Sequence, residues 1–136
     1  MTILEECVSV LIPARNESAT IGAVVGAVLQ NLPQAEVLVV DDGSHDGTGE
    51  TARAAGARVI RHSLPRGKGA ALRTGFKAAQ SQLVVTIDGD GQDDAADLPA
   101  LVEAARGGAD LTIGSRFLGR FEPGSISLPN YLATRA

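Results

Sequence analysis

Short apolar runs alternate along the chain with longer segments whose apolar residues recur at helical spacing. The clearest helical segment extends from Ile21 to Leu32, and Ser18 is the expected N-cap. Continuous runs such as 37–40 are typical of strands that are covered on both faces. The pattern predicts strands at 7–12, 37–40, 58–62, 83–87 and 111–113, and helices at 21–32, 49–55, 72–79 and 97–105.

Alternating strands and helices indicate an α/β fold with a Rossmann-like, mostly parallel sheet and helices on both faces. The length of 136 residues suits a single domain spanning 1–136. The expected strand order is 3-2-1-4, with the fifth strand beyond the fourth. From Arg116 onward the pattern fades into Gly, Pro and Ser, and no element is predicted there.

Polar residues cluster directly after four of the predicted strands, at 13–17, 41–46, 88–94 and 114–116. Ligands of parallel α/β sheets bind beyond the carboxyl ends of the strands. The four loops are therefore expected to form one site.

Composition narrows the class of protein. A net charge of −4 and an aromatic content of 3% disfavour nucleic-acid binding. Cys7 is the single cysteine, which excludes an internal disulfide and a multi-cysteine metal site. No apolar stretch approaches the roughly 18 residues of a membrane span. Glu5 and Glu6 stand where a signal peptide would be basic, so a cytoplasmic location is predicted.

The charges are segregated along the chain. Residues 51–87 carry seven Lys and Arg and no acidic residue, whereas 88–97 carry five Asp. Two solvated faces would explain this pattern. The alternative is an anion held between cationic groups and a carboxylate-bound metal.

Three short motifs fit that alternative. Asp88, Asp90 and Gln92 offer two carboxylates and an amide oxygen on alternate residues, a ligand set suited to Mg²⁺ or Mn²⁺. Asp42 could accept hydrogen bonds from a nucleobase or ribose, and Lys68 within Gly-Lys-Gly could approach a phosphate. Each motif could equally be an ordinary turn, helix cap or exposed loop.

Other nucleotide and hydrolase motifs have less support. No Gly-Lys pair is followed by Ser or Thr, so the P-loop pattern is absent, and so is GxSxG. Residues 47–52 match the GxGxxA dinucleotide fingerprint. However, the next acidic residue is Asp88, far beyond the roughly 20 residues expected for a ribose-binding acid. An NAD(P)-binding domain therefore remains a remote alternative.

The ordered set of motifs resembles family 2 glycosyltransferases, and most nearly the dolichol- and polyprenyl-phosphate sugar synthases among them. The resemblance covers about Val8 to Phe117. It rests on VSVLIPARNE at 8–17, VVDDGS at 39–44, DGT at 46–48, RGKGA at 66–70, DGDGQ at 88–92 and GSRF at 114–117.

The resemblance implies a GT-A fold and transfer of a sugar from a GDP- or UDP-linked donor with inversion at the anomeric carbon. It implies that a nucleotide-sugar site includes Lys68, that Asp90 and Arg116 are catalytic, and that Mg²⁺ or Mn²⁺ is the cofactor. By the same resemblance, Pro13, Arg15, Glu17, Val40 and Asp42 surround the nucleoside, while Asp88, Gly89, Asp90 and Gln92 form the metal and diphosphate site.

The chain also departs from the family pattern. Members that act on hydroxyl acceptors carry a later Glu-Asp pair, whereas after Asp110 this chain has only Glu122. An ionised phosphate needs no general base, so the missing pair is consistent with a polyprenyl-phosphate acceptor at the inner membrane face, but a truncated chain would show the same. Residues 117–136 are expected to begin an acceptor-side segment that is incomplete here.

An alternative function is that of a non-catalytic nucleotide-sugar-binding module, or of a donor-binding half that needs a partner. A short sheet would expose apolar edge surface, so association with a second copy or with a partner subunit is expected.

Overall fold

A computed structural model describes residues 7–106, 111–115, 120–123 and 131–135. These residues form an α/β fold whose sheet has the strand order β3-β2-β1-β4-β7-β5-β6. In chain order the elements are β1 (Val8–Ala14), α2 (Ile21–Asn31), β2 (Glu36–Asp42), α3 (Thr48–Ala54), β3 (Arg58–His62), α4 (Lys68–Ala78), β4 (Leu83–Thr86), the 3₁₀ turn η1 (Ala95–Asp97), α5 (Leu98–Arg106), β5 (Leu111–Ser115), β6 (Arg120–Pro123) and β7 (Tyr131–Arg135).

The parallel part of the sheet confirms the predicted 3-2-1-4 order, since β1 pairs in parallel with β2 and β4, and β2 with β3. The fifth predicted strand, β5, lies beyond β4 but not beside it. β7 is inserted between them and is antiparallel to both, and β6 pairs with β5 at the far edge. β6 and β7 were not predicted, because neither segment contains a continuous apolar run.

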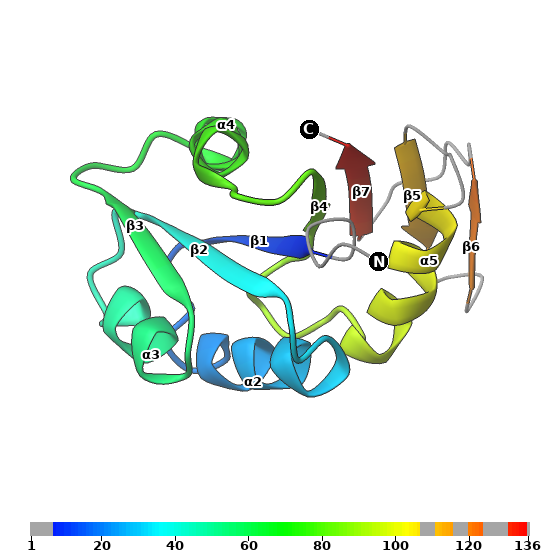
Figure 1. Cartoon of the computed structure of the whole chain (residues 1–136). Helices are drawn as coiled ribbons and strands as arrows, with labels where there is room; N and C mark the ends of the chain where they lie inside the picture. Colours follow the sequence, from blue (N-terminus) through cyan, green and yellow to red (C-terminus); the bar gives the residue numbers. More distant parts are fainter. Residues whose placement is uncertain (1–6, 107–110, 116–119, 124–130, 136) are drawn as a thin grey trace.

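Helices cover both faces of the sheet, as predicted (Figure 1). α2, α3 and α5 lie against one face and α4 against the other. Side chains alternate between the faces along each strand, so Val10 and Ile12 join the larger core cluster while Leu11 joins a smaller one. The smaller cluster lies beneath α4 and comprises Leu11, Leu38, Val40, Ala71 and Val84.

The start of α2 differs from the prediction. Thr20, not Ser18, is the N-cap residue, and it makes no side-chain capping bond. The Thr20 hydroxyl instead donates to the carbonyl of Gly89, at 2.7 Å, and the N–H of Ser18 donates to Asp46, at 3.1 Å. The Thr20 hydroxyl, which a local cap would use, thus makes a tertiary contact instead.

α4 packs unusually close to the sheet at Gly75. A Cβ atom added there would overlap Leu11 Cδ1 and would lie 2.6 Å from Cδ2 and 2.9 Å from Cγ. The absence of a side chain at residue 75 therefore sets the distance between α4 and β1. The first residue of α4 is Lys68, so this packing also positions the lysine.

Candidate donor-binding cleft

An open cleft of about 360 Å³ lies at the carboxyl ends of β1, β2 and β4. Eight of the residues singled out from the sequence line it, together with Ala14, Gly67 and Ala71. The eight are Pro13, Arg15, Glu17, Asp42, Lys68, Asp88, Gly89 and Asp90. The expectation that separate loops meet at one edge of the sheet is thus met for three of the four loops.

Asp42, the last residue of β2, forms one wall of the cleft and is 5% exposed. Its Oδ1 accepts hydrogen bonds from His62 Nδ1 and from the N–H of Arg66, both at 2.8 Å, and its Oδ2 accepts one from the N–H of Gly67, at 2.8 Å. Burial raises the pKa of Asp42, but the hydrogen bonds from His62, Arg66 and Gly67 together outweigh it, so the pKa is lowered. Asp42 is therefore an ionised group that can only accept hydrogen bonds.

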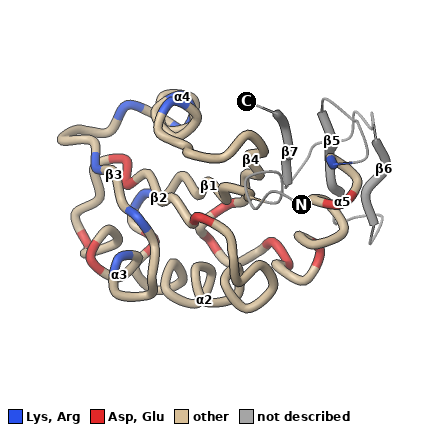
Figure 2. Tube along the Cα trace, in the orientation of Figure 1, with Lys and Arg blue, Asp and Glu red and all other residues tan. Residues whose placement is uncertain are grey.

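Lys68 and Asp88 both line the cleft and form an ion pair there. Lys68 Nζ lies 2.8 Å from Asp88 Oδ1, and the two side chains are 63% and 36% exposed. Figure 2 shows further lysine and arginine on α4 and on the segment before it. The segregated charges of the sequence thus meet at this cleft, although the basic residues of 51–87 also extend away from it.

Two hydrogen bonds stabilise the turn after β4, and one of them orients the carboxylate of Asp90. The N–H of Asp88 donates to Asp93 Oδ2, at 2.9 Å, and the N–H of Gln92 donates to Asp90 Oδ1, at 3.0 Å. Among the residues described, no three His, Cys, Asp or Glu side chains form a metal-binding group. Two carboxylates nevertheless suit Mg²⁺ or Mn²⁺, which take further ligands from water and substrate phosphates. Asp88 is an exposed carboxylate that pairs with the Lys68 ammonium. A divalent ion would take the place of that ammonium on the same oxygens.

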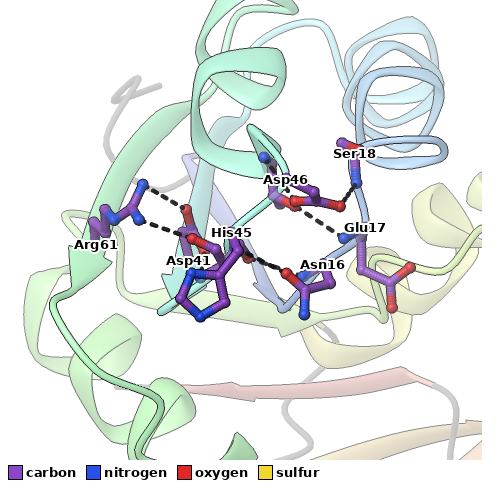
Figure 3. Close-up of polar contacts among 9 residues, drawn as sticks. Asn16, Glu17, Ser18, Asp41, His45, Asp46 and Arg61 are labelled. Atoms are coloured by element: carbon purple, nitrogen blue, oxygen red, sulfur yellow. Dashed lines mark hydrogen bonds and ion pairs between the residues drawn. The ribbon is translucent and has the colours of Figure 1, made fainter.

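The loop that carries Arg15 and Glu17 is bound to the loop after β2 by several hydrogen bonds (Figure 3). We call this set the loop latch. It comprises Asn16 N–H to Ser44 Oγ at 2.9 Å, His45 N–H to Asn16 Oδ1 at 2.9 Å, Glu17 N–H to Thr48 Oγ1 at 2.9 Å, and Ser18 N–H to Asp46 Oδ2 at 3.1 Å. Asn16 adopts the left-handed conformation, with φ of 54°.

Asp46 joins the latch bond from Ser18 to two further bonds from Thr48. Its Oδ1 accepts from both the N–H and the hydroxyl of Thr48. These bonds, with the hydroxyl of Thr48 foremost and the contacts from Ser18 next, lower the pKa of Asp46 to about 2. Asp46 is exposed, but its carboxylate fixes two loops relative to each other.

Asp41, the neighbour of Asp42, points away from the cleft. Its Oδ1 accepts from the N–H of Ser44, at 3.0 Å, and Arg61 Nη1 lies 3.8 Å from its Oδ2 (Figure 3). Arg61 Nη2 also donates to the carbonyl of Ser44, at 2.8 Å. The first aspartate of this pair therefore supports the turn, and the second faces the site.

Two sequence-based site residues are not among the described residues that line the cleft. Val40 is completely buried in the cluster beneath α4. The Gln92 side chain is exposed and is not among the described residues that line the cleft, although its backbone orients Asp90. Arg116 lies outside the described residues. None of the cleft-lining residues belongs to 47–52, so the dinucleotide fingerprint has no place in this site.

The sequence analysis missed the partner of Asp42. His62 ends β3 and is 7% exposed, and it contacts Asp42 across a separation of 20 residues. A histidine at the end of a predicted strand was the available signal, but its partners depend on the tertiary fold.

The strand order, the helices on both faces and the polar cleft at the carboxyl edge define a GT-A domain. The chain belongs to glycosyl transferase family 2, whose family model matches residues 9–132.

Named relatives support the assignment. The chain is 40% identical over 114 residues to undecaprenyl-phosphate 4-deoxy-4-formamido-L-arabinose transferase of Aeromonas hydrophila, a match covering 76% of this chain and 35% of that protein. It is 41% identical over 118 residues to polyprenol monophosphomannose synthase of Mycolicibacterium smegmatis, covering 80% and 44%. The chain thus spans less than half the length of these two relatives.

A solved structure gives the same result for the fold. Glucosyl-3-phosphoglycerate synthase from Mycobacterium tuberculosis, in complex with Mn²⁺, uridine-diphosphate-glucose and phosphoglyceric acid, is 27% identical with a TM-score of 0.72. The match covers 95% of this chain and 56% of that protein. In the part of the chain that is described, no helix has the length and apolar character needed to span a membrane.

Proposed function

We propose that this chain binds the donor in a glycosyltransferase that moves a sugar from a GDP- or UDP-linked donor to a polyprenyl phosphate, with inversion. The carrying observation is the cleft itself, which is lined together by an ionised aspartate, a lysine and two further carboxylates. A nucleoside diphosphate offers hydrogen-bond donors for the aspartate and phosphates for the lysine and for a carboxylate-bound metal.

The nucleoside is proposed to lie at the Asp42 end. Because Asp42 only accepts hydrogen bonds, the ligand group that faces it must be a donor, such as a base N–H or a ribose hydroxyl. Pro13, Arg15 and Glu17 complete this end, and the loop latch fixes the position of the last two. The side chain of Val40 packs in the core cluster beneath α4, so its proposed contribution to the nucleoside site is through that packing.

The diphosphate is proposed to lie near Lys68 and Gly89, which also line the cleft. Asp88 and Asp90 would hold Mg²⁺ or Mn²⁺, which when bound supplies positive charge to stabilise the leaving diphosphate. Lys68 can leave Asp88 for a phosphate oxygen, since both side chains are exposed and the pair is worth little on its own. Catalytic roles for Asp90 and Arg116, and a ligand role for Gln92, remain predictions.

The proposed transfer needs no proton-accepting side chain. An oxygen of the ionised acceptor phosphate attacks the anomeric carbon from the face opposite the leaving group. The bond between that carbon and the diphosphate oxygen breaks, and its electron pair stays on the nucleoside diphosphate.

The acceptor class is proposed from the names of the relatives, two of which are transferases acting with undecaprenyl phosphate or polyprenol. Such an acceptor would require peripheral attachment at the inner membrane face. Because the chain covers 35% and 44% of these relatives, a donor-binding half that needs further chain or a partner subunit is the second candidate. Association with a second copy or a partner is likewise proposed.

Calorimetric titration of the chain with UDP, GDP and their sugar conjugates, each with Mn²⁺ and with chelator, tests the donor site. We expect metal-dependent binding of one nucleotide and its loss in Asp90→Asn. The matched control is Glu103→Gln, an exposed acid on α5 that does not line the cleft. Binding that is equal with and without metal would refute the metal assignment, and binding of no nucleotide would refute the donor site.

Transfer of labelled sugar to undecaprenyl phosphate then separates the two candidates. Product formed by the chain alone supports the complete enzyme. Donor binding without transfer supports the donor-binding half.

A further inference from the structure

A buried polar array connects the cleft to the middle of α4. His62 Nδ1 lies 2.8 Å from Asp42 Oδ1, and His62 Nε2 lies 2.8 Å from Thr74 Oγ1. Asp42 ends β2, His62 ends β3 and Thr74 lies on α4, so three elements contribute one residue each. Both ring nitrogens of a histidine that is 7% exposed are therefore engaged.

The chemistry of the partners defines the hydrogen bonds. An ionised carboxylate can only accept, so Nδ1 of His62 must carry a proton and donate to Asp42. In the neutral ring Nε2 is then an acceptor, and the hydroxyl of Thr74 donates to it. Asp42 sets the tautomer of the ring, and Thr74 satisfies the nitrogen that would otherwise be buried without a partner.

The same bonds restrict the orientation of Asp42. A carboxylate has about four acceptor positions, and three are filled by His62 and by the N–H groups of Arg66 and Gly67. Two of the three donors bond to Oδ1 and one bonds to Oδ2. The one acceptor position that remains is therefore on Oδ2. Asp42 lines the cleft, and the array leaves that single position for a ligand.

We propose that His62 is a positioning residue for donor recognition: its Nδ1–H holds Asp42 so that one carboxylate oxygen presents its free acceptor position to the nucleoside. The inference rests on the proposed nucleoside role of Asp42. His62 acts only through Asp42, because it is buried and is not among the residues that line the cleft in the described part of the chain. The N–H groups of Arg66 and Gly67 each hold one carboxylate oxygen, and the ring adds a second donor on Oδ1 that further fixes the rotation about the Cβ–Cγ bond.

The ring orientation can be measured without any ligand. Long-range ¹H–¹⁵N spectra of the histidine ring report which nitrogen carries the proton. We expect a protonated Nδ1 for His62 in the unmodified protein. A neutral ring protonated on Nε2 would overturn the proposal, because Nδ1 could then not donate to Asp42.

Three variants separate positioning from stability. His62→Asn places an amide N–H near the position of Nδ1, whereas His62→Leu removes the donor. Thr74→Val keeps the Nδ1–H donor but leaves Nε2 unsatisfied, so it lowers stability without removing the bond to Asp42. Thr51→Val, on α3 and away from the cleft, controls for the exchange of threonine for valine.

Each variant is titrated with the preferred nucleotide and with Mn²⁺ pyrophosphate, and its Tm is recorded. We expect His62→Leu to weaken nucleotide binding about tenfold, since a hydrogen bond to a charged group is lost. Nucleotide affinity should stay within about threefold in His62→Asn and Thr74→Val. Pyrophosphate affinity should be unchanged in every variant, because that ligand lacks a nucleoside.

The outcomes are distinct. Equal losses of nucleotide affinity in His62→Leu and Thr74→Val would show a stability effect and overturn the proposal, as would a parallel loss of pyrophosphate binding. Unchanged nucleotide affinity in His62→Leu would also overturn it. If the unmodified protein binds no nucleotide, the proposed function fails, and the ring spectrum still decides how His62 is oriented.

Discussion

The contact between Gly75 and Leu11 predicts a large effect of a single methyl group. In Gly75→Ala the new Cβ would overlap Leu11 Cδ1 and lie 2.6 Å from Cδ2 and 2.9 Å from Cγ. Leu11 is completely buried between the sheet and α4, so it has no open space into which to move. Either α4 or β1 must shift to accommodate the methyl group.

The magnitude follows from two opposing effects. Overpacking a core costs about 1–3 kcal/mol, and overlap with three atoms of one side chain places Gly75→Ala at the upper end. Alanine favours a helix over glycine by about 1 kcal/mol. The expected net loss is about 2 kcal/mol, which corresponds to a decrease in Tm of roughly 6–10 °C for a chain of this size.

Urea unfolding followed by circular dichroism measures the loss, and Gly26→Ala is the matched control. Gly26 lies on α2 and a Cβ added there meets no atom within 4 Å, so that variant should gain about 0.5–1 kcal/mol from helix propensity. A displaced α4 should also weaken nucleotide binding through Lys68. If Gly75→Ala is as stable as Gly26→Ala, the close packing does not constrain α4 and the reasoning is wrong.

Three further predictions concern the loops and the cleft. Asp46, whose pKa is lowered to about 2, stabilises the fold fully above the ordinary pKa of 3.8. The difference in unfolding free energy between wild type and Asp46→Asn should therefore shrink as the pH falls from 4 toward 2; a difference independent of pH would contradict this. Gly43→Ala should lose roughly 2 kcal/mol in urea unfolding, because φ is 74° and the new Cβ would lie 2.6 Å from the nitrogen of Pro65. Lys68→Gln should strengthen binding of free Mn²⁺, since the ammonium competes for Asp88, but weaken binding of Mn²⁺ with a nucleoside diphosphate. Calorimetry in which both affinities change in the same direction would refute that competition.

The parallel part of the fold could be predicted because β1, β2 and β4 contain continuous apolar runs that are covered on both faces, whereas β3 offers only Val59 and Ile60. Val37 to Val40 illustrates both the strength and the limit of that pattern. The run identifies a strand, but alternation sends Val39 to one core cluster and Val40 to the other, and the sequence does not say which face bears the cleft. The strand is therefore predictable, but the face on which each of its side chains lies depends on the fold, and the nucleoside role of Val40 stays a prediction.

Elements and contacts that depend on distant partners could not be predicted. β7 is a short segment whose place between β4 and β5 is fixed only by pairing with both. Likewise the Thr20 hydroxyl bonds to Gly89, 69 positions away, so local capping rules gave the wrong residue for the start of α2. The cleft loops were easier, because parallel strands bring their carboxyl ends together whatever the details of the loops.

The position of β7 has a consequence for synthesis on the ribosome. β1 to β4 can pair with one another as soon as they have emerged, since none of their mutual pairs involves a later strand. β5 and β6 are made next, but the strand that joins them to β4 is β7, which is made after both. When only the residues before Tyr131 have left the exit tunnel, β1 to β4 can therefore be paired while β5 and β6 still lack the strand that joins them to β4. Pulse-labelled nascent chains should become protease-resistant in two stages, and the second should begin only when residues 131–135 leave the exit tunnel.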